Sequence, residues 1–301
     1  MNVKFLLAAM VLMAAGCTNE SQDSSVISSD EQAIAPVRVH VDGFSVSQQD
    51  FSESQTRAVQ DVADYSEIKT VTLAFYKSDG TLQYSASQLR TNMPEEGKVF
   101  GEFSLGLPMG SYTMVVIASG SAYPMTLNSM SEAVFDTQEV RVRDTFLAKQ
   151  TVDVTTNTAL DLTATLSRVI SKLQVNSSDG RTSDVSNVRM TFSAGGQGVN
   201  PLNGFALTDA GFSNTVSVSA AAGSISQSVS NLFLATDEQT MNVTIETLDA
   251  DGAVLFSKTV NDVPFKRNRI TKLTGAMYTN EAVSGTFKVE TAWLDEYNAN
   301  F

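Results

Sequence analysis

The chain has 301 residues, of which 42% are hydrophobic and 18% are charged. This length favours two domains over one, and the composition is that of a chain with hydrophobic cores, which excludes overall disorder and a bundle of membrane helices. The 33 acidic residues outnumber the 20 basic ones, so the net charge is −13. Such a charge argues against binding to nucleic-acid phosphates.

The chain contains one cysteine and one histidine, Cys17 and His40. A single cysteine forms no internal disulfide. Histidine is the side chain that most often binds zinc or acts as an acid–base catalyst, and the chain has only one. We therefore expect a protein that is not an enzyme and that carries no cofactor and no metal ion.

The N-terminal segment predicts a secretory signal peptide. Lys4 precedes an apolar run over residues 5–15, which is too short to span a bilayer as a helix. Ala14-Ala15-Gly16-Cys17 resembles a bacterial lipobox, with alanine where the commonest lipobox has leucine. The resemblance implies removal of residues 1–16 and attachment of lipid to Cys17. The alternative is an ordinary signal peptide that leaves a free thiol.

Residues 17–35 are rich in Ser, Gln, Asp and Glu, a composition typical of a flexible tether. Each buried CH₂ of an acyl chain contributes about 0.8 kcal/mol, so two or three chains hold a folded body on a membrane. We therefore expect a lipid-anchored outer-membrane protein, exposed at the cell surface, whose acidic body stands off the lipid.

Residues 36–157 are expected to form an N-terminal β-sandwich. Val37, Val39 and Val41 alternate with polar residues, which predicts a strand with one buried face and places His40 on the polar face. Only 59–64 and 128–134 are candidates for short helical connectors. Further strands are expected at 70–76, 82–84, 99–105, 112–118 and 140–142, with hairpin turns at 78–81 and 108–110.

Residues 158–301 are expected to form a C-terminal β-sandwich, because alternation resumes at Leu160 after the polar stretch near 155–158. Asp249-Ala250-Asp251-Gly252 predicts a hairpin turn rather than a calcium loop, since the third ligand and the distant glutamate are missing. Strands are expected at 160–166, 169–175, 188–192, 216–219, 229–234, 241–248, 254–260, 270–277 and 285–293.

Three segments resemble the fimbrillin superfamily of Bacteroides-type fimbriae: residues 68–76 with the Asp79-Gly80 turn, residues 100–118, and residues 166–173. The likeness covers nearly the whole chain, and it depends mainly on the order of lipoprotein signal, two sandwiches and this hairpin. It implies two tandem transthyretin-like antiparallel β-sandwiches and a role in a fimbrium and in cell adhesion. The implied partners are other fimbrial subunits, bound by strand addition at a sheet edge.

The same family contains anchor subunits that keep their lipid and stalk subunits that a surface protease cuts after an arginine. Residues 294–301 carry two acids and no alternating β-branched run, so they make a poor donor strand, which favours an anchor or minor subunit. Arg57-Ala58 lies where a stalk or tip subunit would be processed, although a solvated loop arginine is the simpler interpretation.

A surface glycan-binding lipoprotein is the alternative from another class of protein. Its binding platform would use Tyr112, Tyr123 and Trp293, although these aromatic residues are more typical of the core and of hairpin edges. A hydrolase comes last, because the chain has no Gly-x-Ser-x-Gly motif. The sequence does not identify the neighbouring subunit, a glycan or a host receptor.

Overall fold

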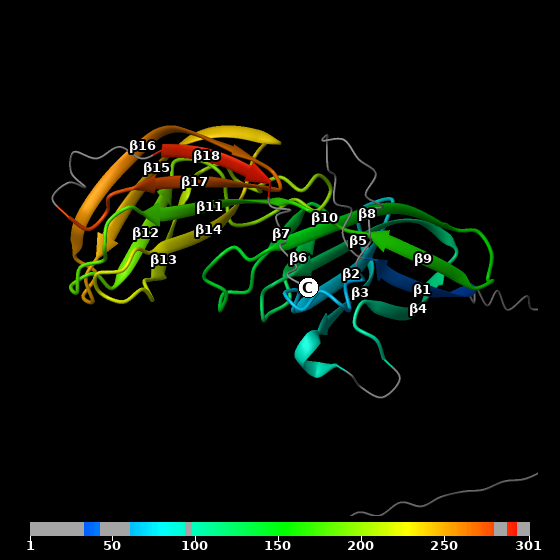
Figure 1. Cartoon of the computed structure of the whole chain (residues 1–301). Coiled ribbons are helices and arrows are strands. Elements are labelled where there is room, and N and C mark those ends of the chain that lie inside the picture. The colour runs from blue at the N-terminus through cyan, green and yellow to red at the C-terminus, as the bar shows by residue number, and fades with distance from the viewer. Residues whose placement is uncertain (1–32, 43–60, 94–97, 280–287, 294–301) are drawn as a thin grey trace, which may run out of the picture. The chain divides into compact units, whose positions relative to one another are not determined.

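The computed structural model describes residues 33–42, 61–93 and 98–279 and the backbone of residues 288–293 (Figure 1). From Ala33 onward these residues belong to one compact unit. The predicted signal peptide with Cys17, the tether up to residue 32, the Arg57-Ala58 pair and the C-terminal tail all lie outside the described residues.

The first sandwich packs a three-stranded sheet, of order β4-β1-β9, against a five-stranded sheet, of order β10-β8-β5-β2-β3. One turn of 3-10 helix, η1 (Arg90–Asn92), follows β3. The strands are β1 (Ile34–Asp42), β2 (Thr70–Lys77), β3 (Leu82–Leu89), β4 (Glu102–Pro108), β5 (Gly110–Ser119), β8 (Thr145–Val154), β9 (Leu160–Thr165) and β10 (Ser167–Arg168).

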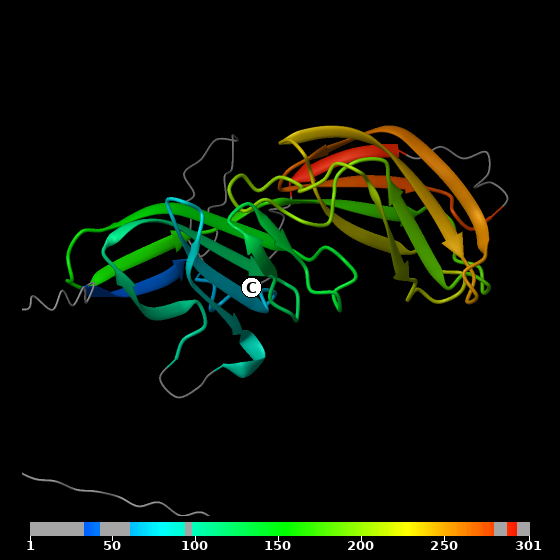
Figure 2. The same ribbon diagram turned by 180° about the vertical axis from the view of Figure 1, so that it is seen from behind.

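The second sandwich packs a sheet of order β14-β11-β17-β18 against a sheet of order β13-β12-β15-β16. Its strands are β11 (Ile170–Ser177), β12 (Asn187–Phe192), β13 (Phe212–Ser217), β14 (Gln227–Phe233), β15 (Glu238–Leu248), β16 (Val254–Lys266), β17 (Arg269–Gly275) and β18 (Lys288–Trp293). Figure 2 shows both sandwiches from behind.

The two sandwiches have the same strand arrangement. In each, the first strand pairs antiparallel with the fourth and parallel with the last of seven, as in β4-β1-β9 and β14-β11-β17. The remaining four strands form the facing antiparallel sheet, as in β3-β2-β5-β8 and β13-β12-β15-β16. The first sandwich adds β10 on the outer edge of β8 and a hairpin of β6 (Thr126–Ser129) and β7 (Glu132–Val134), whereas the second adds β18 on the outer edge of β17.

The expected all-β sandwich fold is confirmed, with two parallel strand pairs among the antiparallel ones. The expected boundary between residues 157 and 158 does not match the strand pairing, because β9 pairs with β1 and β10 pairs with β8, which extends the first sandwich to Arg168. In the described ranges, no helix is long and apolar enough to cross a membrane.

Three local predictions were wrong. Residues 61–64 form turns, and residues 128–134 belong to the β6–β7 hairpin, so neither segment is helical where it is described. The strand expected at 140–142 begins only at Thr145. Turn and strand edges depend on contacts with distant segments, which a local pattern does not report.

Each sandwich encloses its own core, and a third apolar cluster covers the outer face of the five-stranded sheet. The alternation of β2 correctly predicts that Val71, Leu73 and Phe75 face the first core. The opposite face, with Ala74 and Tyr76, is buried as well, because the third cluster covers it. Other members of that cluster are Val115, Ile117, Met125, Ala133, Val142, Leu147, Val169, Ile170, Val199 and Phe233.

Candidate interaction site on the first sandwich

Strand β1 occupies the middle of the three-stranded sheet, with β4 on one side and β9 on the other. Its inward residues Val37, Val39 and Val41 are at most 1% exposed. The alternation therefore places this strand as predicted, with one face in the core. Any chain segment before residue 33 is joined to the body through β1.

His40 lies on the polar face of β1, as predicted, and three carboxylates surround its ring. Nε2 of His40 is 2.8 Å from Oδ1 of Asp42 and 3.4 Å from Oδ2 of Asp61, while Nδ1 is 3.7 Å from Oε1 of Glu102. The alternation of β1 places Asp42 on this face, but Asp61 and Glu102 come from distant parts of the chain. When His40 is protonated, the cluster ties β1 to β4 and to the segment before β2.

The outer face of the three-stranded sheet carries a polar hollow of about 580 Å³. Its lining is contributed by β1, β4 and β9 and includes Arg38, His40, Glu102, Asp161 and Thr163. In the described part of the chain, no group of three or more His, Cys, Asp or Glu residues is arranged to hold a metal ion.

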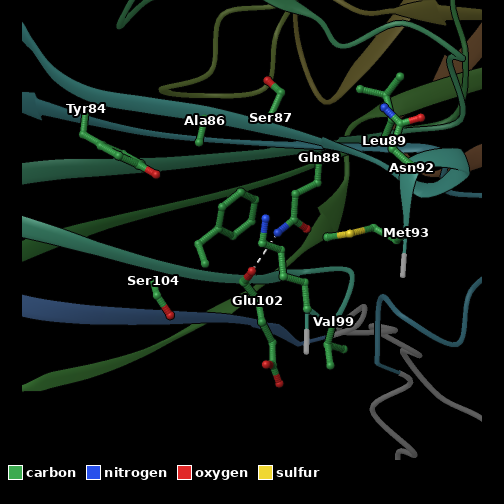
Figure 3. Close-up of a pocket in the computed structure, with 12 residues that line it drawn as sticks. Tyr84, Ala86, Ser87, Gln88, Leu89, Asn92, Met93, Val99, Glu102 and Ser104 are labelled. Atoms are coloured by element: carbon green, nitrogen blue, oxygen red, sulfur yellow. Dashed lines mark hydrogen bonds between the residues drawn. The ribbon is translucent and has the colours of Figure 1, made fainter. Parts of the chain in front are cut away.

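A second hollow of about 500 Å³ lies between β3 and β4, the edge strands on one side of the first sandwich (Figure 3). Gln88 spans this opening: its Nε2 donates to the Glu102 carbonyl at 2.7 Å, and its Oε1 accepts from the Gly101 amide at 2.8 Å. Burial raises the pKa of the Tyr84 hydroxyl at the end of the hollow. One side-chain amide thus links the two sheets where their backbones do not pair.

Gly101 is positioned by close packing as well as by this contact. Its φ of +94° lies in the region that favours glycine, and an added Cβ would overlap Cγ1 of the fully buried Val62. We expect Gly101→Ala to lower the free energy of unfolding by about 2 kcal/mol or more, because strain and steric overlap add. Urea denaturation checks this value.

Gly80→Ala is the matched control for this substitution. Gly80 has a similar φ of +83°, but an added Cβ would meet nothing within 4 Å. The control is therefore expected to lower the free energy of unfolding by only about 1 kcal/mol, from backbone strain alone. Equal losses in the two variants would show that the contact with Val62 is unimportant.

Arg90, which begins η1, binds the chain segment that leads into β2. Its guanidinium donates to four backbone carbonyls at 2.6 to 2.9 Å, and its Cζ lies 4.2 Å from the centre of the Phe100 ring. Burial lowers the pKa of Arg90, and the charge of Asp64 opposes that shift. The four acceptors are the carbonyls of Val62, Ala63, Tyr65 and Ile68.

The structure describes Tyr112 and Tyr123, two of the aromatic residues considered for a glycan platform, and the backbone of the third, Trp293. Tyr112 is 4% exposed, donates to the Pro108 carbonyl at 2.9 Å and packs edge-on against Phe75. Tyr123 is exposed and lies between β5 and β6. Trp293 ends β18, and its backbone pairs with Arg269 in the second sandwich. The structure therefore places Tyr112 in the core, while the side chain of Trp293 lies outside the described residues.

The predicted turn at Asp249–Gly252 is confirmed. Oδ1 of Asp249 accepts from the amides of Asp251 at 3.0 Å and Ala253 at 2.8 Å, which closes the hairpin between β15 and β16. This carboxylate is used by the turn itself, as expected of an Asx-turn.

This geometry defines a class: a two-sandwich β protein in which the first strand lies at the centre of its sheet. Residues 37–300 match the family described as "Family of unknown function (DUF6562)", and the chain belongs to this family. No protein in the curated set matches the sequence.

Two solved structures of fimbrial proteins from Porphyromonas gingivalis are similar to this chain. The fimbrial anchor protein Mfa2 shares 10% identity at a TM-score of 0.51, over 86% of this chain and 98% of its own. The tip fimbrial protein Mfa3, with a C-terminal truncation, shares 10% identity at a TM-score of 0.43, over 86% and 99%. The expected likeness to fimbrillin-type proteins is confirmed at the level of the fold by the first of these.

Proposed function

We propose that this protein is a non-enzymatic, lipid-anchored subunit of a cell-surface fimbrium, in the position of an outer-membrane anchor or minor component. The observation that carries the proposal is the match of its fold to 98% of the fimbrial anchor protein Mfa2. Its contacts with neighbouring subunits are made by strand addition at a sheet edge, a mode that uses main-chain hydrogen bonds for affinity. The lipobox at Cys17 supplies the membrane attachment.

The position of β1 makes lipid anchoring depend on an uncut chain at Arg57-Ala58. Cleavage after Arg57 would leave β1 joined to the rest of the protein only by its two ladders and its buried side chains. Any load on a lipid at Cys17 would then act on a peptide that is no longer covalently bound. An anchor must therefore keep Arg57-Ala58 intact.

The lipid attachment is tested by Cys17→Ser. We expect this variant to leave the outer-membrane fraction, because no acyl chain remains to hold an acidic body on an anionic surface. Arg57→Ala is the control and should stay in the membrane fraction. Fractionation and intact-mass measurement provide the readout, with acylated Cys17 expected in the same chain as residues 58–301. A mature N-terminus at Ala58 would instead identify a stalk or tip subunit.

A further inference from the structure

The outer edge of β9 differs from its counterpart in the second sandwich. The strands β9 and β17 occupy the same place, each parallel to the first strand of its sandwich. On β17 the outer edge is covered by β18, which pairs antiparallel over Lys288–Trp293. Within the described ranges, β9 ends its sheet and pairs with no strand on its outer side. Figure 1 labels β9 and β17, and in Figures 1 and 2 β18 is the red strand beside β17.

Burial along the two strands reflects this difference. Residues of β17 alternate between buried and half-buried over the whole strand, whereas the first four residues of β9 alternate between half-buried and exposed. Leu160 and Leu162 lie in register with the buried Val37 and Val39 and pack against the same core, yet both stay half-exposed. An edge strand whose inward apolar residues remain partly exposed to solvent can act as a template for pairing with another strand.

We infer that the outer edge of β9 (Leu160–Thr165) accepts an antiparallel β-strand from a neighbouring fimbrial subunit, completing the first sandwich as β18 completes the second. This inference rests on the proposed function and names the sheet edge that it uses. The strand that binds has the length of β18, which like β9 has six residues. Its alternate apolar side chains cover Leu160 and Leu162, and its other side chains meet the exposed Asp161 and Thr163.

In an anchor subunit, the outer edge of β9 is a better place for an incoming strand than the position that β1 occupies. Strand β1 already fills the centre of the sheet, and its loss would expose the core and detach a lipid at Cys17. Addition at β9 leaves both intact.

The charge at this edge argues for a strand from another protein. Asp161 is exposed on β9, so an added strand with basic or neutral outward residues is favoured over an acidic one. The segments 18–32, 43–60 and 294–301 of this chain each carry more acidic than basic side chains. A strand of a neighbouring subunit therefore fits the edge better than these segments do.

A pair of matched leucine variants tests the edge in the full-length protein in its own cells. Leu105 on β4 and Leu160 on β9 flank the same residue, Val37, at opposite edges of one sheet, and both are half-buried against the same core. An inward-pointing lysine blocks pairing at an edge while its stem still covers apolar surface. We expect Leu160→Lys to reduce co-purified fimbrial subunits by about tenfold and Leu105→Lys to leave them within about twofold.

The outcomes of that comparison are separable. An equal loss of co-purified subunits in both variants, or no loss in either, overturns the assignment to β9. The proposed function still stands in that case if the wild type binds fimbrial subunits. Wild-type protein that brings down no fimbrial subunit overturns the proposed function and this inference together. Thermal melts of both variants should fall equally, so that a difference in binding reflects the edge.

A photo-crosslinking amino acid at Asp161 identifies what covers the edge, with the same amino acid at Ser104 as the control. Both positions are exposed, and both pair with Arg38 from opposite sides. The expected product joins position 161 to an extended segment of a separate two-sandwich subunit. A product from position 104 alone, or one that joins position 161 to residues 43–60 or 294–301 of the same chain, overturns the inference.

Discussion

The substitution Val39→Asp is expected to unfold the first sandwich. Val39 is 1% exposed at the centre of the central strand β1, between Phe103 of β4 and Leu162 of β9. The change places a carboxylate without a partner in an apolar core, which costs more than about 4 kcal/mol. Hydrogen exchange followed by mass spectrometry should show lost protection in β2 and β5, while the separately packed core around β12 and β15 keeps its protection.

Arg38→Ser is the control for this prediction, because Arg38 is the exposed neighbour on the same strand. A surface change of this kind is expected to stay within about 0.5 kcal/mol of the wild type. If Val39→Asp melted within about 2 °C of the wild type, β1 would not be part of the core in solution. The proposed anchoring through β1 would then lose its physical basis.

Replacement of Arg90 by methionine is expected to be the second most damaging change. Methionine keeps an apolar stem against Phe100 but removes the guanidinium donors to the carbonyls of Ala63 and the fully buried Ile68. The other two carbonyls, those of Val62 and Tyr65, still accept from backbone amides. Buried acceptors without donors destabilise strongly, so we expect a loss of about 3 kcal/mol in the free energy of unfolding. Urea denaturation measures this loss.

Arg90→Met should also expose the segment between residues 61 and 68 to proteases, since the guanidinium holds it in place. Limited proteolysis of the variant should therefore cut in this segment at protease concentrations that leave the wild type intact. Arg38→Met serves as the control, because it removes a guanidinium from an exposed position. Equal proteolysis of the two variants would show that Arg90 does not hold the segment. Arg90→Lys is expected to recover little, because an ammonium lacks the planar fork that reaches several carbonyls.

The pattern of residues in β1 and β2 shows where sequence reasoning succeeds and where it ends. In β1, the alternation predicts the buried face correctly, and His40 lies on the other side. In β2, the same alternation predicts one buried face, but residues 70–76 are all buried. The reason is the third apolar cluster, which brings together strands and loops that are far apart in the chain.

Local pattern alone is enough to predict an all-β chain, because a period of two is readable without knowledge of the neighbouring strands, and the fold confirms it. A cysteine after small residues likewise predicts a lipoprotein signal, which stays a prediction. Tertiary structure alone decides which strands are adjacent. The parallel pairing of β1 with β9, the pairing of β18 with β17 and the contacts of Arg90 with its carbonyls each join residues distant in sequence. Within the described ranges, β9 is the last strand of its sheet. Pairing partners depend on long-range packing, so no local period specifies which edge of a sheet stays free.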